Sequence, residues 1–185
     1  MRLIYAVIVI LGLNTQAISE VNKTDLTPYQ ILKIESYAKK GVADAQYLLA
    51  SMYMNGQGIR RDLHKAFKWF KKAALQGHMS AQYNIGVMFD NGMSVKENNK
   101  EAVKWYKAAA SKGFAQAQYN LGIMYFNGEG IQENIIHAYK WFIIAANAGN
   151  QHARNGLEVL KKNMTRKQIN KAEVLAKKRD PILSN

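Results

Sequence analysis

The chain has 185 residues, of which 48% are hydrophobic and 21% are charged, a composition that is typical of a folded globular protein and excludes a disordered one. The 26 Lys and Arg residues exceed the 13 Asp and Glu residues, so the formal net charge is +13. Cysteine is absent, which excludes disulfides, thiolate metal sites and cysteine nucleophiles.

The N-terminal residues have the pattern of an export signal. Arg2 precedes the apolar run of residues 3–13, and polar residues then lead to Ala17. A membrane-spanning helix needs about 20 apolar residues, so this run is too short to be one. We therefore predict a signal peptide at residues 1–17, cleaved near Ala17, and a periplasmic or secreted protein. An uncleaved anchor or a buried helix is the alternative.

A 36-residue repeat organises the rest of the chain. Gly41, Gly77, Gly113 and Gly149 are evenly spaced, and the intervening units share Ala-Gln-Tyr, Asn-Gly, Lys-Trp and Ala-Ala at matching positions. Apolar residues recur at steps of three and four in each half of a unit, which predicts two helices per unit. We therefore expect an all-α fold of nine helices without strands, in which helix-turn-helix units stack on one another.

The repeat also predicts the divisions of the chain and the ends of its helices. After the signal peptide we expect a linker at 18–27, a half-repeat helix at 28–40, repeats at 41–76, 77–112 and 113–148, a degenerate C-terminal capping repeat at 149–179 and a tail at 180–185. In the first repeat, Asn55 and Gly56 should end a helix that begins near Ala43. The predicted N-caps are Asp62, Asn98, Asn134 and Thr165.

These motifs resemble the Sel1-like repeat of the tetratricopeptide superfamily. Residues 81–92 and 102–113 read Ala-Gln-Tyr-Asn-Ile-Gly-x-Met-Phe-x-Asn-Gly and Ala-x-Lys-Trp-Tyr-x-x-Ala-Ala-x-x-Gly, and residues 117–128 and 138–149 repeat the pattern. Residues 45–77 match it more loosely. The resemblance implies an α/α superhelical solenoid that acts as an interaction adaptor. The missing cysteines depart from the disulfide-bearing exported members of the family, so no hydrolase-like activity is carried over from them.

The resemblance also implies a place for a partner protein. In related helical solenoids the first helices of successive repeats line the concave surface. The residues carried over, called here the first-helix row, are Tyr47, Ser51, Met54, Tyr83, Asn84, Val87, Asp90, Tyr119, Asn120, Ile123 and Phe126. The alternative for the three tyrosines is that they bridge neighbouring repeats. The positions that vary between repeats are expected to set specificity, so charge reversal at Asp90 should weaken binding without lowering the melting temperature.

Positive charge is concentrated near the C-terminus. This basic segment comprises Lys161, Lys162, Arg166, Lys167, Lys171, Lys177, Lys178 and Arg179. An acidic protein, an anionic glycan and an anionic lipid surface all fit such a field, whereas nucleic acid is not expected, because no nucleic-acid-binding motif accompanies the charge. The alternative is a solvated polar cap. Lys68, Lys104 and Lys140 recur in the second helices, and we expect them on the outer face.

The sequence offers no pattern that indicates catalysis. Its four histidines occupy unmatched repeat positions without metal-ligand spacing, and no pair of carboxylates suggests acid–base chemistry, so neither a cofactor nor a metal is expected. We therefore predict a non-catalytic scaffold or adaptor that binds a partner protein through its concave face. The alternatives are a periplasmic immunity-type protein that neutralises a toxin and a cell-wall-active enzyme or regulator.

Overall fold

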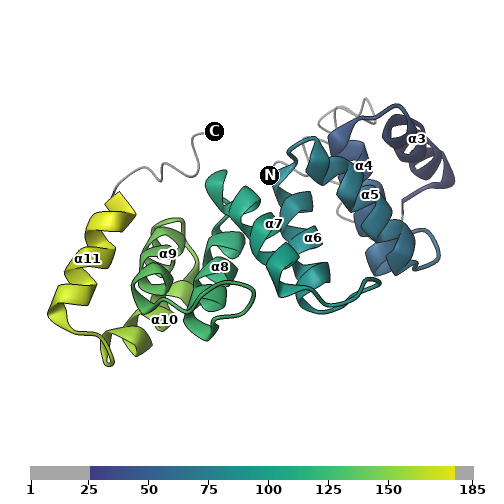
Figure 1. Ribbon diagram of the computed structural model, residues 1–185. Coiled ribbons are helices and arrows are strands. Elements are labelled where there is room, and N and C mark those ends of the chain that lie inside the picture. Colours follow the sequence, from purple (N-terminus) through teal and green to yellow (C-terminus); the bar gives the residue numbers. More distant parts are fainter. Residues whose placement is uncertain (1–25, 178–185) are drawn as a thin grey trace. The chain divides into compact units, whose positions relative to one another are not determined.

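The computed structural model describes residues 26–177, and that part of the chain is helical without a strand (Figure 1). The helices are α3 (Pro28–Lys39), α4 (Ala43–Asn55), α5 (Leu63–Leu75), α6 (Met79–Asp90), α7 (Asn99–Ser111), α8 (Ala115–Asn127), α9 (Ile135–Asn147), α10 (Gln151–Lys161) and α11 (Arg166–Lys177). Within the described residues, these nine helices confirm the predicted all-α fold. The predicted signal peptide and the C-terminal tail lie outside them.

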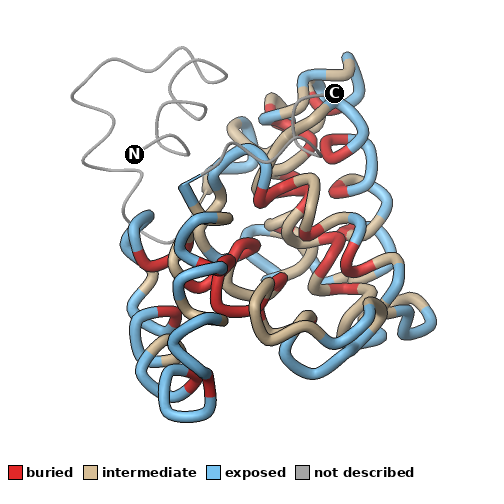
Figure 2. The backbone as a smooth tube through the Cα atoms, turned by 60° about the vertical axis from the view of Figure 1, so that its left-hand side comes forward, coloured by how far each residue is buried: buried red, intermediate tan, exposed pale blue. Residues whose placement is uncertain are grey.

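The chain divides into two compact units within α6. The first unit ends at Ile85 and contains α3, α4, α5 and the start of α6. The second begins at Gly86 and contains the remaining helices. Each unit has a hydrophobic cluster of its own, and Figure 2 shows buried positions recurring along the helices while many loop positions are exposed.

The core of the first unit forms where α3 and α5 pack against α4. Its buried cluster consists of Ile34, Ala38, Ala45, Leu49 and Met52. The repeated alanines are buried, including Ala66, Ala73 and Ala74 on α5, because small side chains let helices approach closely. Tyr53 and Trp69 pack against the same cluster and fill wider spaces.

The core of the second unit is centred on α9, which contacts α8, α10 and α11. Its buried cluster consists of Ala138, Tyr139, Phe142, Ala145, Ala146, Ala153, Leu160, Met164 and Ala172. Close approach of aromatic rings to α6 and α8 requires glycine. A Cβ atom at Gly86 would lie 2.7 Å from the Tyr106 ring, and one at Gly122 would lie 2.6 Å from the Phe142 ring.

Local capping explains where the helices begin and end. The side chains of Asp62, Asn98 and Asn134 each accept a hydrogen bond from the backbone N–H three residues later, as predicted. Thr165 Oγ1 accepts in the same way at α11. Gly56 and Gly128 end α4 and α8 with φ angles of 72° and 74°, a left-handed conformation that most residues avoid.

A buried glutamine common to the three repeats connects each first helix to the helix before it. Nε2 of Gln46, Gln82 and Gln118 donates to the backbone oxygen eight residues earlier, at 3.2, 3.1 and 3.1 Å. These acceptors lie in the last turn of α3, α5 and α7, where helix carbonyls have no partner within the helix. The Ala-Gln-Tyr motif therefore combines a small packing residue with a bond between successive helices.

Candidate functional site

The first-helix row of the first unit lies on α4 and the start of α6. Tyr47, Ser51 and Met54 share one face of α4 and are partly exposed, as are Tyr83 and Asn84 on α6. Ser51 Oγ donates to the backbone oxygen of Tyr47 at 3.0 Å, and Asn84 Nδ2 donates to the backbone oxygen four residues earlier at 2.8 Å. These two donors are therefore bonded to their own helices.

Tyr47 and Tyr119 pack against the start of the following repeat. The Tyr47 ring stacks on His78 with a centroid separation of 4.5 Å, and the Tyr119 ring lies 5.9 Å from His152. Both tyrosines remain partly exposed. The alternative predicted for the tyrosine row, that it bridges neighbouring repeats, therefore describes these two members, and only part of each ring remains open to a partner.

His78 is held by contacts to both of its ring nitrogens. Nδ1 accepts from the backbone N–H of Ala81 at 3.2 Å, within the first turn of α6, and Nε2 lies 3.3 Å from Oδ1 of Asp44. Because each nitrogen has a protein partner, neither is positioned to activate a nucleophile. The Asp44–His78 contact therefore joins the first repeat to the second.

The Asp90 carboxylate accepts a hydrogen bond from a side chain of the next helix, which was not predicted from the sequence. The hydroxyl of Tyr106, a fully buried residue of α7, donates to Oδ2 of Asp90 at 2.9 Å, and the Asp90 side chain is partly buried. Burial raises the pKa of Asp90, and the negative charges of Glu129 and Glu97 raise it further, while the hydrogen bond from Tyr106 opposes the rise.

Alignment of the repeats shows how this pair could have been found. Met54 and Phe126 occupy the position of Asp90 in the other two repeats, and Phe70 and Phe142 occupy the position of Tyr106. The polar residues thus occur together in one repeat. Because packing and hydrogen bonding determine Asp90, charge reversal there should lower the melting temperature, contrary to the expectation from sequence.

The second unit carries the most exposed member of the first-helix row. Phe126 stands at the end of α8 and is 43% exposed. Asn120 and Ile123 precede it on the same helix and are partly buried, as is Val87 on α6, and Ile123 packs against the cluster around α9. In each unit the members of the row are therefore partly exposed, and Phe126 is the member that extends furthest into solvent.

The described part of the basic segment lies at the C-terminal end of α10 and on α11. Its described members are all exposed, and they are Lys161, Lys162, Arg166, Lys167, Lys171 and Lys177. Lys178 and Arg179 lie outside the described residues. These six side chains form no ion pair with an acidic residue within residues 26–177, and their charged groups face solvent.

The lysines common to the second helices do not share one environment. Lys68 and Lys104 are exposed as predicted, but Lys140 is only 5% exposed. The Nζ atom of Lys140 lies 4.7 Å from the centroid of the neighbouring Trp141 ring. The outer-face prediction was therefore wrong for Lys140, because α9 is covered by the C-terminal helices α10 and α11 as well as by α8.

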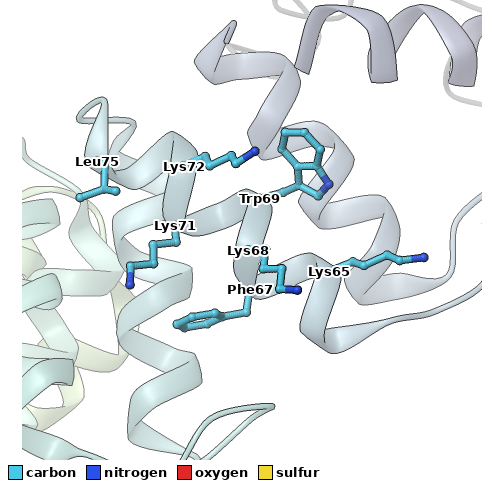
Figure 3. Close-up of a pocket in the computed structure, with 7 residues that line it drawn as sticks. All are labelled: Lys65, Phe67, Lys68, Trp69, Lys71, Lys72 and Leu75. Atoms are coloured by element: carbon cyan, nitrogen blue, oxygen red, sulfur yellow. The ribbon is translucent and has the colours of Figure 1, made fainter. Parts of the chain in front are cut away.

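An apolar groove on α5 was not predicted. Its volume is about 510 Å³, and Figure 3 shows the lining side chains projecting from this one helix. The lining residues are Lys65, Phe67, Lys68, Trp69, Lys71, Lys72 and Leu75. A signal was present in the sequence, because Lys65, Lys72 and Leu75 are not repeated at the matching positions of the second and third repeats.

Neither a metal centre nor a membrane span is found in the part of the chain that the structure describes. Within residues 26–177, no group of three or more His, Cys, Asp or Glu side chains could hold a metal ion. The helices of the same region are too short or too polar to cross a bilayer.

Comparisons with known proteins agree with the repeat pattern. The Sel1 repeat family model matches residues 43–78, 80–114 and 115–150. Among solved structures, a Sel1 repeat protein from Oxalobacter formigenes is 34% identical, with a TM-score of 0.65, and the match covers 69% of this chain and 96% of that chain. Curated proteins gave no significant match.

Two further structures support the same fold. A protective antigen present in uropathogenic Escherichia coli strains, which displays an SLR fold, is 26% identical with a TM-score of 0.61, covering 81% of this chain and 40% of that chain. Helicobacter pylori cysteine rich protein B is 22% identical with a TM-score of 0.57, covering 70% and 96%. The α/α solenoid class and the Sel1-like resemblance are thereby confirmed.

Proposed function

Because this chain belongs to the Sel1 repeat family, we propose that it is a non-catalytic scaffold that binds a partner protein through its first-helix row. Sel1 repeat proteins are generally protein-interaction scaffolds, and the family is typically non-catalytic. The repeats provide a helical frame, and the side chains that differ between repeats provide the specificity for one partner.

The exposure of Phe126 is the observation that carries this proposal. A large aromatic side chain is 43% exposed at the end of α8, where the other repeats have Met54 and Asp90. The aromatic ring is therefore not a requirement of the repeat fold. Exposed aromatic side chains give large binding contributions when a partner buries them, because they lose little conformational entropy.

Site-specific photo-cross-linking in the native host tests this function. A photoreactive phenylalanine analogue is introduced at position 126 or 54, and at the exposed Val159 of α10 as a matched control. We expect one and the same protein to be cross-linked from positions 54 and 126 but not from 159. Absence of an adduct at both row positions, or an equal adduct from position 159, would contradict the proposal.

We further propose that the protein is exported and acts in the periplasm or outside the cell. The support is the pattern of residues 1–17, a basic start, a short apolar run and a small-residue exit. Cell fractionation followed by N-terminal sequencing tests it. The exported form should begin near Ile18, and a full-length chain confined to the cytoplasm would contradict export.

Toxin neutralisation is one form of the same binding function. In that case the protein cross-linked from positions 54 and 126 is a toxin, and co-expression of this chain protects cells from it. A cell-wall-active enzyme predicts a different outcome, which is turnover of peptidoglycan by the purified chain. We expect no turnover, and a reproducible product would refute the scaffold proposal.

A further inference from the structure

The groove on α5 combines apolar surface with a dense row of positive charge. Leu75 is 69% exposed, while Phe67 and Trp69 are partly exposed, and Trp69 also packs on the core of the first unit. The four surrounding lysines, Lys65, Lys68, Lys71 and Lys72, are exposed. In Figure 3 the aromatic rings project to different sides of α5, and lysine side chains lie between and above them.

Most of this positive charge lacks a carboxylate partner. Lys65 pairs with Asp62 at 3.6 Å, and Lys72 Nζ lies 4.3 Å from the centroid of the Trp69 ring. Lys68 and Lys71 form no ion pair within the described residues, and α5 itself contains no Asp or Glu. The groove therefore offers uncompensated positive charge beside apolar surface.

The repeat architecture does not require these side chains. At the position of Lys65 the later repeats have glutamate and histidine, at Lys72 they have alanine and isoleucine, and at Leu75 they have serine and asparagine. Packing of one repeat on the next succeeds without the cluster of lysines and without an exposed leucine. The groove is thus a feature of the first repeat alone.

We infer that this groove binds an acidic amphipathic segment of a partner protein. Apolar side chains of the segment lie against Leu75 and the exposed edges of Phe67 and Trp69, while its carboxylates pair with the lysines. A second copy of this chain is disfavoured because each copy carries a net charge of +13. A flat lipid surface fits less well, because the two aromatic rings project to different sides of α5 rather than toward one plane (Figure 3).

The spacing of the lysines on α5 determines the spacing expected for the acidic residues of the partner segment. Lys65, Lys68 and Lys72 follow at intervals of three and four residues, which aligns them along one face of α5 over about 10 Å. An extended segment covers that distance in about three residues and a helix in about seven. This surface lies on a second helix, so the inference goes beyond the proposed function of the first-helix row.

Selection from a displayed peptide library tests the inference with the full chain. The library contains 12-residue peptides with Glu or Asp fixed at the helical and extended spacings given above, and the affinity of selected peptides is measured by fluorescence anisotropy. We expect K68E/K72E to weaken binding about 10-fold or more and L75A to weaken it about 5-fold, because the first removes charge pairing and the second removes apolar contact.

The matched control is K161E/K162E, which makes the same change in charge at two exposed residues at the C-terminal end of α10. It should leave the affinity within about 2-fold of wild type, and F126A should do the same. An equal loss in the control would overturn the inference in favour of general charge attraction, as would the absence of any binder that depends on Lys68 and Lys72. Phosphatidylglycerol vesicles that bind through these lysines, with no peptide doing so, would overturn it in favour of lipid. The F126A control distinguishes peptide binding in this groove from peptide binding at the first-helix row.

Discussion

Asp90 illustrates how a variable side chain can still be determined by packing. A comparison of the first helices alone suggests that packing does not determine this side chain, because methionine and phenylalanine replace it in the other repeats. Its hydrogen bond from buried Tyr106 shows that two residues on neighbouring helices differ together between the repeats. The position of Asp90 on its helix was predictable from the repeat, but its partner depends on the contact between α6 and α7.

A double-mutant cycle measures this pair. Tyr106→Phe removes the hydroxyl that donates to the partly buried Asp90 carboxylate, and Asp90→Met removes the carboxylate that accepts from it, so each should lower the free energy of unfolding by about 1–2 kcal/mol. The double variant recreates the Met54–Phe70 combination of the first repeat and should recover most of the loss. Urea denaturation gives the free energy of unfolding of the two single variants and of the double variant. Strictly additive losses would mean that the two side chains do not stabilise each other.

Asp62 and Asp90 should change stability with pH in opposite directions. The backbone hydrogen bond from Lys65 is the main cause that lowers the pKa of Asp62, so the stability it contributes is present above pH 3.8 and is lost as the pH falls. Burial raises the pKa of Asp90, so the folded state holds that proton more tightly than the unfolded state. Stability from Asp90 therefore decreases as the pH rises above 3.8.

Thermal melts of D62N and D90N between pH 3 and pH 7 test these signs. Relative to wild type, the melting temperature of D90N should increase with rising pH, because asparagine cannot ionise. The relative melting temperature of D62N should decrease over the same range, because wild type gains its charged cap. If the relative melting temperatures of the two variants changed with pH in the same direction, at least one of the assigned pKa shifts would be wrong.

Gly122 is required by distance rather than by backbone conformation. A Cβ atom there would lie 2.6 Å from the Phe142 ring and 3.3 Å from the backbone oxygen of Ala138, so α8 would have to move away from α9. Gly122→Ala should therefore lower the free energy of unfolding by about 1–3 kcal/mol. In G122A/F142L the shorter side chain should relieve part of the clash, so the two losses should not add. Wild-type stability of G122A in urea would contradict this packing.

Helix boundaries were predicted well because their causes are local. The Asn-Gly stop and the Asp or Asn caps lie within a few residues of each boundary, and the predicted helix from Ala43 to Met54 differs from α4 by one residue. The environment of Lys140 was not predictable in this way. It depends on α10 and α11 covering α9, which is a contact between elements that the 36-residue pattern does not encode.

The cap of α7 offers a test at the level of one helix. Oδ1 of Asn98 accepts from the backbone N–H of Glu101 at 3.1 Å, so Asn98→Ala should cost about 1 kcal/mol of stability. Asn98→Asp should keep the stability near that of wild type, because Asp62 performs the same role at the start of α5. Urea denaturation of both variants checks this expectation, and an equal loss in both would show that the capping oxygen is not what matters.

Charge is the property of the whole molecule that the repeat does not explain. The repeated positions account for one lysine in each second helix, whereas the basic segment and two of the groove lysines, Lys65 and Lys72, lie outside the shared pattern. In the basic segment, charged side chains share α10, α11 and the turn between them with buried Leu160, Met164 and Ala172, which belong to the cluster around α9. The same helices therefore cover a core on one side and present cations on the other.

This double role determines how contact between the basic segment and an anionic lipid surface must be tested. Deletion of residues 160–185 would uncover the core around α9, so loss of binding could follow from unfolding. Charge reversal at exposed Lys161, Lys162, Lys167 and Lys171 avoids that problem and should change the melting temperature little. Each basic residue near such a surface is worth about 1 kcal/mol, so flotation with phosphatidylglycerol vesicles should fall at least 10-fold at low salt. Undiminished flotation would exclude this contact with lipid.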